Sequence, residues 1–138
     1  MNEKKQLTTA FLKKINDDFS LKIDISKSTL QSLKNKSSIL IIRTISKKFI
    51  KYMVYPVQND TVIKITTYGI NFSSENTLKI FEILKKFNII HTSGVSLKKD
   101  EIIQEIYLNP KEIDQSILEK EIKDIEGIYK LLIEKINY

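Results

Sequence analysis

Few side chains in this sequence have the types and spacing that catalysis requires. His91 is the only histidine, and no acidic or nucleophilic residue stands at a useful spacing from it. Cysteine is absent, which excludes disulfides, thiolate zinc sites and cysteine nucleophiles. Asp17, Asp18 and Asp24 lack a calcium-binding loop, and the three glycines form no phosphate-binding or dinucleotide-binding motif. We therefore predict a protein that is not an enzyme, with no metal site and no cofactor.

Basic side chains suggest a second kind of chemistry, the binding of phosphates. The 138 residues hold 23 Lys plus Arg against 17 Asp plus Glu, a formal net charge of +6. Residues 1–57 have 12 basic and 4 acidic residues, a net charge of +8, whereas residues 58–138 have 11 and 13, a net charge of −2. Such an asymmetry suggests an anionic partner for the first part, most often nucleic acid or an anionic membrane face.

Lysines suit phosphate contacts, and a single arginine gives little capacity to read bases. The alternative is that these lysines are the polar edge and face of a sheet, where they prevent edge-to-edge pairing. The candidate nucleic-acid-binding residues are Lys34, Lys36, Arg43, Lys47, Lys48 and Lys51.

The hydrophobic pattern of the first part predicts helix, strand, short helix, strand, strand. Residues 4–19 have the spacing of an amphipathic helix, and residues 21–25 alternate like a strand. A brief helix follows to Leu33, capped by Ser26 or Ser28. The β-branched run 39–42 predicts a strand that is buried on both faces, and a further strand over residues 49–55 ends at Pro56.

The second part predicts the order βαββαβ. Its four strands are expected over residues 62–68, 89–97, 101–108 and 129–133. The first helix begins after Ser73 or Ser74 and runs to about Phe87, and the second begins after Asp114. Gly127 stands where a left-handed C-cap is expected. Both helices must cross one face of an antiparallel sheet, so the predicted fold class is α+β with a ferredoxin-like unit.

Residues 61–136 resemble the ACT domain and its relative, the effector-binding (RAM) domain of leucine-responsive regulators. The likeness is carried by the strand 61–68 running into Gly69, by the helix 78–87, and by residues 118–128. It implies a non-enzymatic module that pairs its sheets in dimers and binds an amino acid or another small ligand. ACT domains commonly have an Asp and a Pro-Gly pair in the loop after the first strand, of which this chain has only the glycine. The candidate ligand-binding residues are Gly69, Asn71, Ser73, Ser74 and His91.

We accordingly divide the chain into a basic N-terminal unit, residues 1–57, and an ACT-like unit, residues 58–138. The N-terminal unit is either an incomplete copy of the ferredoxin-like unit, making a pseudo-dimer, or a shortened winged helix. We favour the incomplete copy, because only about eight residues separate Phe19 from Ser28. A helix-turn-helix needs a further helix in that interval, and its residues alternate like a strand.

The functional expectation is a regulatory or scaffolding protein that acts through small-ligand binding and dimerisation. The alternative is a nucleic-acid-binding protein, similar to a transcription regulator, that uses the basic N-terminal half. The sequence has no apolar run of about 18 residues and no signal peptide pattern, so we expect a cytoplasmic protein without a membrane partner. The resemblance to ACT domains implies a homodimer.

Overall fold

The computed structural model describes residues 38–136 apart from 72 and 99, together with the isolated positions 10, 12, 31, 33 and 36. The helix predicted over residues 4–19 and the strand predicted over residues 21–25 lie outside this description. The choice between an incomplete ferredoxin-like copy and a winged helix depends on those residues. Of the short helix that was predicted to end at Leu33, Gln31 is helical and Leu33 is in a turn.

The described chain forms two antiparallel sheets. The first is a hairpin of two strands, β1 (Ser38–Ile45) and β2 (Ile50–Val57). The second has four strands in the order β4-β5-β3-β6, namely β3 (Val62–Ile70), β4 (Ile89–Lys98), β5 (Glu101–Leu108) and β6 (Ile128–Ile136). Numbered within the unit, this order is 2-3-1-4, the arrangement of a ferredoxin-like sheet.

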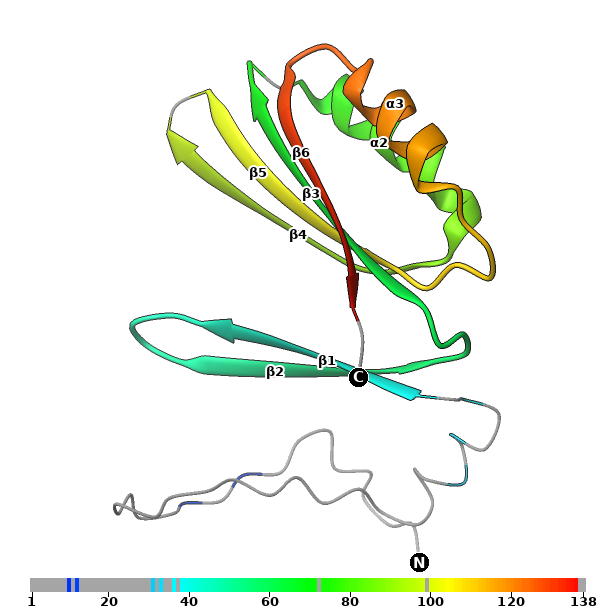
Figure 1. The fold of residues 1–138 in the computed structure, drawn as a ribbon. Helices are drawn as coiled ribbons and strands as arrows, with labels where there is room; N and C mark the ends of the chain where they lie inside the picture. The colour runs from blue at the N-terminus through cyan, green and yellow to red at the C-terminus, as the bar shows by residue number, and fades with distance from the viewer. Residues whose placement is uncertain are drawn as a thin grey trace, which may run out of the picture.

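Two helices connect the strands of the larger sheet, and both lie on one of its faces (Figure 1). They are α2 (Ser74–Leu84), continued by the 3₁₀ helix η1 (Lys85–Phe87), and α3 (Gln115–Lys123). The predicted βαββαβ order is therefore confirmed. The hairpin lies on the opposite side of the sheet from the helices.

Side-chain caps fix where the helices begin. The Ser73 side chain accepts a hydrogen bond from the Asn76 backbone N–H, and Asp114 accepts from the backbone N–H groups of Ser116 and Ile117. Both caps are among those that the sequence predicts. Gly127 has the expected positive φ of 91°, but it lies in the turn before β6, since α3 has its C-cap at Asp124.

The main core fills the space between the sheet and the helices. Alternate side chains of β3 point toward the helices, so Ile63 and Ile65 are completely buried, as are Ile80 and Leu84 of α2. The remaining buried members of this core are Ile106, Leu108, Leu118, Ile122 and Ile125.

A smaller core joins the hairpin to the other face of the sheet, which we call the open face. Leu40, Ile42 and Val57 from the hairpin pack with Val62 of β3, and Met53 and Tyr55 lie beside them. The prediction that residues 39–42 are buried on both faces is wrong. Ile39 and Ile41 point away from the sheet and are 42% and 57% exposed, because a two-stranded sheet has only one covered face.

Asn109 ties the end of the hairpin to the larger sheet. Its side-chain oxygen accepts hydrogen bonds from the backbone N–H groups of Gln58 and Asn59 at 3.1 Å. Its side-chain NH₂ donates to the carbonyls of Asn59 and Thr61 at 2.7 and 2.8 Å. Because Asn109 is 1% exposed, these bonds also satisfy the polar atoms of its own buried side chain.

Candidate functional site

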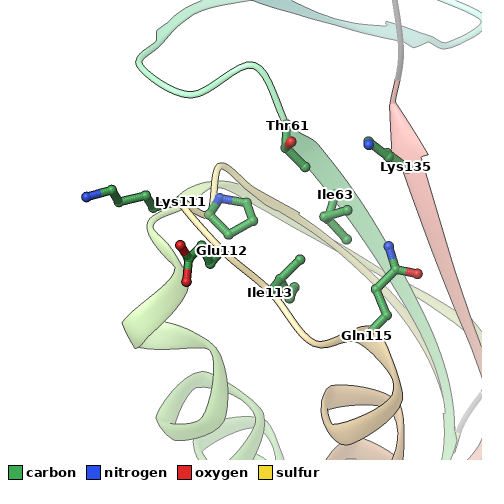
Figure 2. Close-up of a pocket in the computed structure, with 8 residues that line it drawn as sticks. Thr61, Ile63, Lys111, Glu112, Ile113, Gln115 and Lys135 are labelled. Atoms are coloured by element: carbon green, nitrogen blue, oxygen red, sulfur yellow. The ribbon is translucent and has the colours of Figure 1, made fainter.

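A cavity lies where β3 begins, β6 ends and the connection from β5 enters α3 (Figure 2). Its volume is about 380 Å³, within the size range of small-molecule sites. We call it the charged pocket, and its lining consists of Thr61, Ile63, Pro110, Lys111, Glu112, Ile113, Gln115 and Lys135.

The charged pocket has an apolar floor between two polar sides. Figure 2 shows Ile63 and Ile113 in the middle, with Gln115 and Lys135 on one side and Glu112 on the other. Lys111 stands at the outer margin on the side of Glu112. A cationic side, an amide and a carboxylate thus surround an apolar surface, an arrangement that can hold a molecule with charges of both signs.

The charged side chains at this pocket are available to a ligand. Neither Lys111, Lys135 nor Glu112 forms an ion pair within the described residues. All three are exposed, whereas Ile63 beneath them is completely buried. A ligand here can therefore gain charge-assisted hydrogen bonds at the rim and apolar contact with the partly buried Ile113.

The local sequence explains how the pocket is built. Asn109 and Pro110 are both buried directly after β5, so the connection turns inward beneath the sheet. Lys135 pairs with Ile63 in the register of β6 and β3, which places it on the helix-facing side of the sheet.

This site was not predicted from the sequence. One signal was present, because Lys135 continues the alternation of Leu131 and Ile133 and therefore occupies a position where an apolar residue is expected.

The ligand-binding residues predicted from the sequence do not form one cluster. Gly69, Asn71, Ser73 and Ser74 follow one another at the end of β3, where Ser73 already caps α2. His91 pairs with Tyr107 of β5, which in turn pairs with Lys64 of β3, five residues before Gly69. The side chain of His91 lies on the open face. None of the five lines the charged pocket, and their role in ligand binding stays a prediction.

His91 instead contacts the hairpin. The Tyr55 hydroxyl lies 2.9 Å from His91 Nδ1, and the rings of Tyr55 and Tyr107 lie on either side of the imidazole at centroid distances of 5.6 and 6.2 Å. An aromatic side chain with a polar end can bury its ring and still satisfy that end, as Tyr55 does here. His91 is therefore part of the contact between the two sheets.

An ionic pair lies beside this aromatic group on the open face. Lys64 Nζ is 2.8 Å from Glu105 Oε1 and 5.8 Å from the centre of the Tyr107 ring. The hydrogen bond to Glu105 raises the pKa of Lys64 above its usual value, against the opposing effect of burial. Burial raises the pKa of the Tyr107 phenol, and the nearby Lys64 opposes that rise. At the far end of the same face, a hydrogen bond to Glu101 raises the pKa of Tyr129.

Four of the predicted nucleic-acid-binding residues gather at one end of the hairpin. Lys47 and Lys48 lie in the turn, while Arg43 and Lys51 lie on the adjoining strands. The Ser46 side chain accepts from the backbone N–H groups of Lys48 and Phe49 and so shapes the turn. Lys34 lies outside the described residues, and Lys36 is an exposed isolated position.

Two further observations concern only the described part of the chain. No group of three or more His, Cys, Asp or Glu side chains is placed to hold a metal ion there. Its helices are also too short and too polar to cross a membrane.

No family model matches this sequence, and no curated protein does either. A similar solved structure is the ACT domain from GTP pyrophosphokinase of Chlorobium tepidum, which is 18% identical. The match covers 54% of this chain and 96% of that chain, with a TM-score of 0.44. The sequence pattern predicted a likeness to the ACT domain. The assignment of a ferredoxin-like fold rests on the strand order.

Proposed function

We propose that this protein is a non-enzymatic regulatory module that binds a small zwitterionic molecule, such as an amino acid, in the charged pocket. The observation that carries the proposal is the placement of Lys135 and Glu112 on opposite sides of an apolar floor. Lys135 and the Gln115 amide would bind the carboxylate of the ligand, and Glu112 would bind its ammonium group. Ile113, which is only partly buried, would contact its side chain.

The energetics of the charged pocket favour a modest affinity, as a sensor of an abundant metabolite requires. Ion pairs at exposed positions contribute only about 0–1 kcal/mol each, because water and salt screen them. The apolar floor adds roughly 25 cal/mol for each Å² that the ligand covers. The preference for a zwitterion therefore comes from two matched charges, and the preference among zwitterions comes from the fit of the ligand side chain on Ile113.

The test is a thermal unfolding assay with the twenty amino acids and a set of uncharged analogues. A ligand present at about 100 times its Kd adds about 2.7 kcal/mol to the free energy of unfolding, which raises Tm by roughly 5 °C or more. Lys135→Gln and Glu112→Gln should each reduce this shift. Lys130→Gln is the matched control, because Lys130 is on the same strand but on the open face, over the Tyr68 ring.

Loss of the shift in the Lys130 variant as well would mean that the ligand binds elsewhere. If no amino acid or other zwitterion raises Tm at millimolar concentration, the proposed ligand class is wrong. The methyl ester and the N-acetyl derivative of a binding amino acid complete the test. The first removes the carboxylate charge and the second the ammonium charge, so each should reduce the shift.

Pairing of two copies is part of the proposal. Its support is the apolar surface of the open face that the hairpin leaves uncovered, which includes Val95, Tyr129 and Leu132 at 40–58% exposure. Burying this surface against a second copy would remove apolar area from water. Light scattering after size exclusion measures the mass directly, and Leu132→Lys should shift a dimer to the monomer.

A second candidate function is nucleic-acid binding by the hairpin, favoured by its charge. Between residues 38 and 57 there are four basic side chains and no acidic one. Phe49 and Tyr52 are exposed among them, at 56% and 43%. Exposed aromatic rings beside cations can stack on unpaired bases, and a two-stranded ribbon also fits the major groove of duplex DNA.

Fluorescence anisotropy with labelled single-stranded and duplex oligonucleotides tests this candidate at about 50 mM salt, where release of counterions favours binding most. Replacement of Arg43, Lys47 and Lys48 by Gln should weaken binding at least tenfold and flatten its salt dependence. Replacement of Lys79, Lys86 and Lys123, which lie on the helices and η1, is the control for net charge. Equal losses in the two triple variants would reject a specific role for the hairpin.

A further inference from the structure

The outer end of the hairpin projects beyond its contact with the larger sheet. The smaller core reaches as far as Ile42 and Met53, which pair in the register of β1 and β2. The last pair, Ile45 and Ile50, lies three residues farther on, about 10 Å along the strands. Residues 43–52, which we call the hairpin tip, are all exposed, and their turn is at the end of the hairpin opposite its connection to β3 (Figure 1).

Large apolar side chains gather at the hairpin tip. Ile45 and Ile50 form a cross-strand pair on the outer face, and Phe49 precedes Ile50 in the turn. Their exposed fractions are 64%, 61% and 56%. The exposed apolar surface continues along the outer face through Ile41 and Val54. Adjoining exposed side chains of this kind mark a surface that binds an apolar partner.

Positive charge surrounds the same apolar side chains. Four of the ten residues of the hairpin tip are basic and none is acidic, namely Arg43, Lys47, Lys48 and Lys51. None of the four forms an ion pair with a described residue. The partner that complements both features is anionic at its surface and apolar beneath. A bilayer that contains anionic lipids has this layered chemistry.

The turn of the hairpin is suited to a medium that contains little water. The Ser46 backbone N–H donates to the Phe49 carbonyl at 2.9 Å. The Ser46 side chain accepts from the backbone N–H groups of Lys48 and Phe49 at 3.2 and 3.1 Å. Unpaired backbone groups are costly near lipid chains, and these are already paired within the turn.

We propose that the hairpin tip docks on the surface of a bilayer that contains anionic lipids. Ile45, Phe49 and Ile50 enter the boundary of the acyl chains, while the long basic side chains extend back to the phosphates of the headgroups. No segment crosses the bilayer in this arrangement. The sequence-based expectation of no membrane partner rested on the lack of a spanning segment, which does not bear on contact at the surface. The proposal is independent of the charged pocket.

The apolar side chains distinguish a lipid surface from the nucleic acid considered above for the same hairpin. Phosphates and unpaired bases would engage the basic and aromatic side chains of the tip. They would leave Ile45 and Ile50 in water, whereas lipid chains would cover both. Because these are the two most exposed isoleucines of the hairpin, the observations favour the bilayer.

The first experiment measures cosedimentation of the full chain with phosphatidylcholine vesicles, with and without about 30% phosphatidylserine. We expect binding to the anionic vesicles to be at least about tenfold tighter. Lys47→Gln combined with Lys48→Gln should weaken it about 25-fold, since each basic residue near an anionic surface contributes about fivefold. Lys79→Gln combined with Lys86→Gln, on α2 and η1, is the matched control for net charge and should have little effect.

A second pair of variants tests the apolar contact. Ile45→Thr combined with Ile50→Thr keeps a high preference for strands and should weaken vesicle binding by at least about tenfold. Binding of labelled oligonucleotides should be unchanged by it. Leu78→Gln combined with Ile117→Gln removes exposed apolar area from the helices and is the control. Thermal unfolding shows that both double variants fold.

Tryptophan fluorescence locates the contact directly, because the chain has no tryptophan of its own. Phe49→Trp should show a blue shift of its emission when anionic vesicles are added, since an indole ring at the membrane interface leaves bulk water. Leu78→Trp, on the exposed face of α2, should show no shift.

Three results would overturn the proposal. The first is binding to anionic vesicles that is absent or no tighter than binding to neutral ones, and oligonucleotide binding in that case would assign the hairpin tip to nucleic acid. The second is vesicle binding that persists unchanged in the double isoleucine variant. The third is an equal blue shift for the tryptophans at positions 49 and 78, since contact with lipid would then not be specific to the tip.

Discussion

The hairpin and the four-stranded unit differ in how completely their apolar side chains are buried. In the four-stranded unit, eight of the nine buried core residues are at most 1% exposed, because helices cover one face of the sheet. The four buried residues that join the hairpin to the sheet are 3–7% exposed. The outer face of the hairpin presents Ile41, Ile45 and Ile50 at 57–64% exposure. One region is built around a core of its own, and the other depends on a contact.

This difference distinguishes the contacts that stabilise the fold from the surfaces that are available to a ligand or partner. A two-stranded sheet is marginally stable by itself in water, so the hairpin keeps its shape through Asn109, Tyr55 and the smaller core. Its basic turn takes no part in those contacts and is available to a partner. The four-stranded unit is stabilised by its own helices, which leaves the charged pocket at its margin.

The largest expected effect comes from a cavity in the main core. Ile65→Ala should lower the free energy of unfolding by about 2–5 kcal/mol, because Ile65 is completely buried and the cavity cannot collapse fully. Urea denaturation followed by circular dichroism measures the loss. Ile41→Ala, on the outer face of the hairpin, should cost much less. Equal losses at the two positions would contradict the contrast between the two regions.

The parts of the fold that follow from local pattern were predictable, and those that depend on tertiary placement were not. Alternation in β3 and the caps Ser73 and Asp114 are set by neighbouring residues, so the sequence predicts them correctly. The apolar run 39–42 was misinterpreted because periodicity alone cannot show how many faces of a strand are covered. Likewise, Lys135 lies at the charged pocket because of the register of β6 and β3, which is a relation between distant segments.

Asn109→Ala should have the next largest effect, and it tests the connection between the regions. The change removes the partners of two backbone N–H groups and two carbonyls, and each buried group left unpaired costs about 1–3 kcal/mol. Some of these groups will find water, so we expect a loss of about 3 kcal/mol in the free energy of unfolding.

Asn109→Asp is the informative companion of this variant. A carboxylate can still accept from Gln58 and Asn59, but it cannot donate to the two carbonyls. Its charge would also be buried beside the carbonyl oxygens of Asn59 and Thr61, which offsets the two bonds that it keeps. The aspartate variant should therefore be no more stable than the alanine variant. Near-native stability of the aspartate variant would show that the two donated bonds contribute little.

Tyr55→Phe should have a smaller effect that is confined to the hairpin. It removes the hydroxyl that pairs with His91, at a cost of about 0.5–1.5 kcal/mol, while the ring remains in the smaller core. Native-state hydrogen exchange should show faster opening of β1 and β2, with β3 and β5 unchanged. Tyr52→Phe, on the outer face of the same strand, is the control. Faster exchange throughout the molecule would mean that the two regions unfold as one unit.

The smallest expected effect is a loss of stability at alkaline pH. It arises from Lys64 and Tyr107, which lie on the open face near the hairpin. The pKa of Lys64 is raised above 10.5 and that of Tyr107 above 10.0 in the folded chain. Both contributions to stability are complete below those values and are lost as the pH rises through the folded pKa of each group. Because the pair of Lys64 and Glu105 is partly exposed, its share is about 0.5 kcal/mol. Glu105→Gln removes the main cause of the Lys64 shift, so stability should fall less steeply from about pH 9 to about pH 11 than in the unmodified chain. An unchanged slope, measured by urea denaturation at both pH values, would assign the loss to Tyr107, whose ring packs against the hairpin.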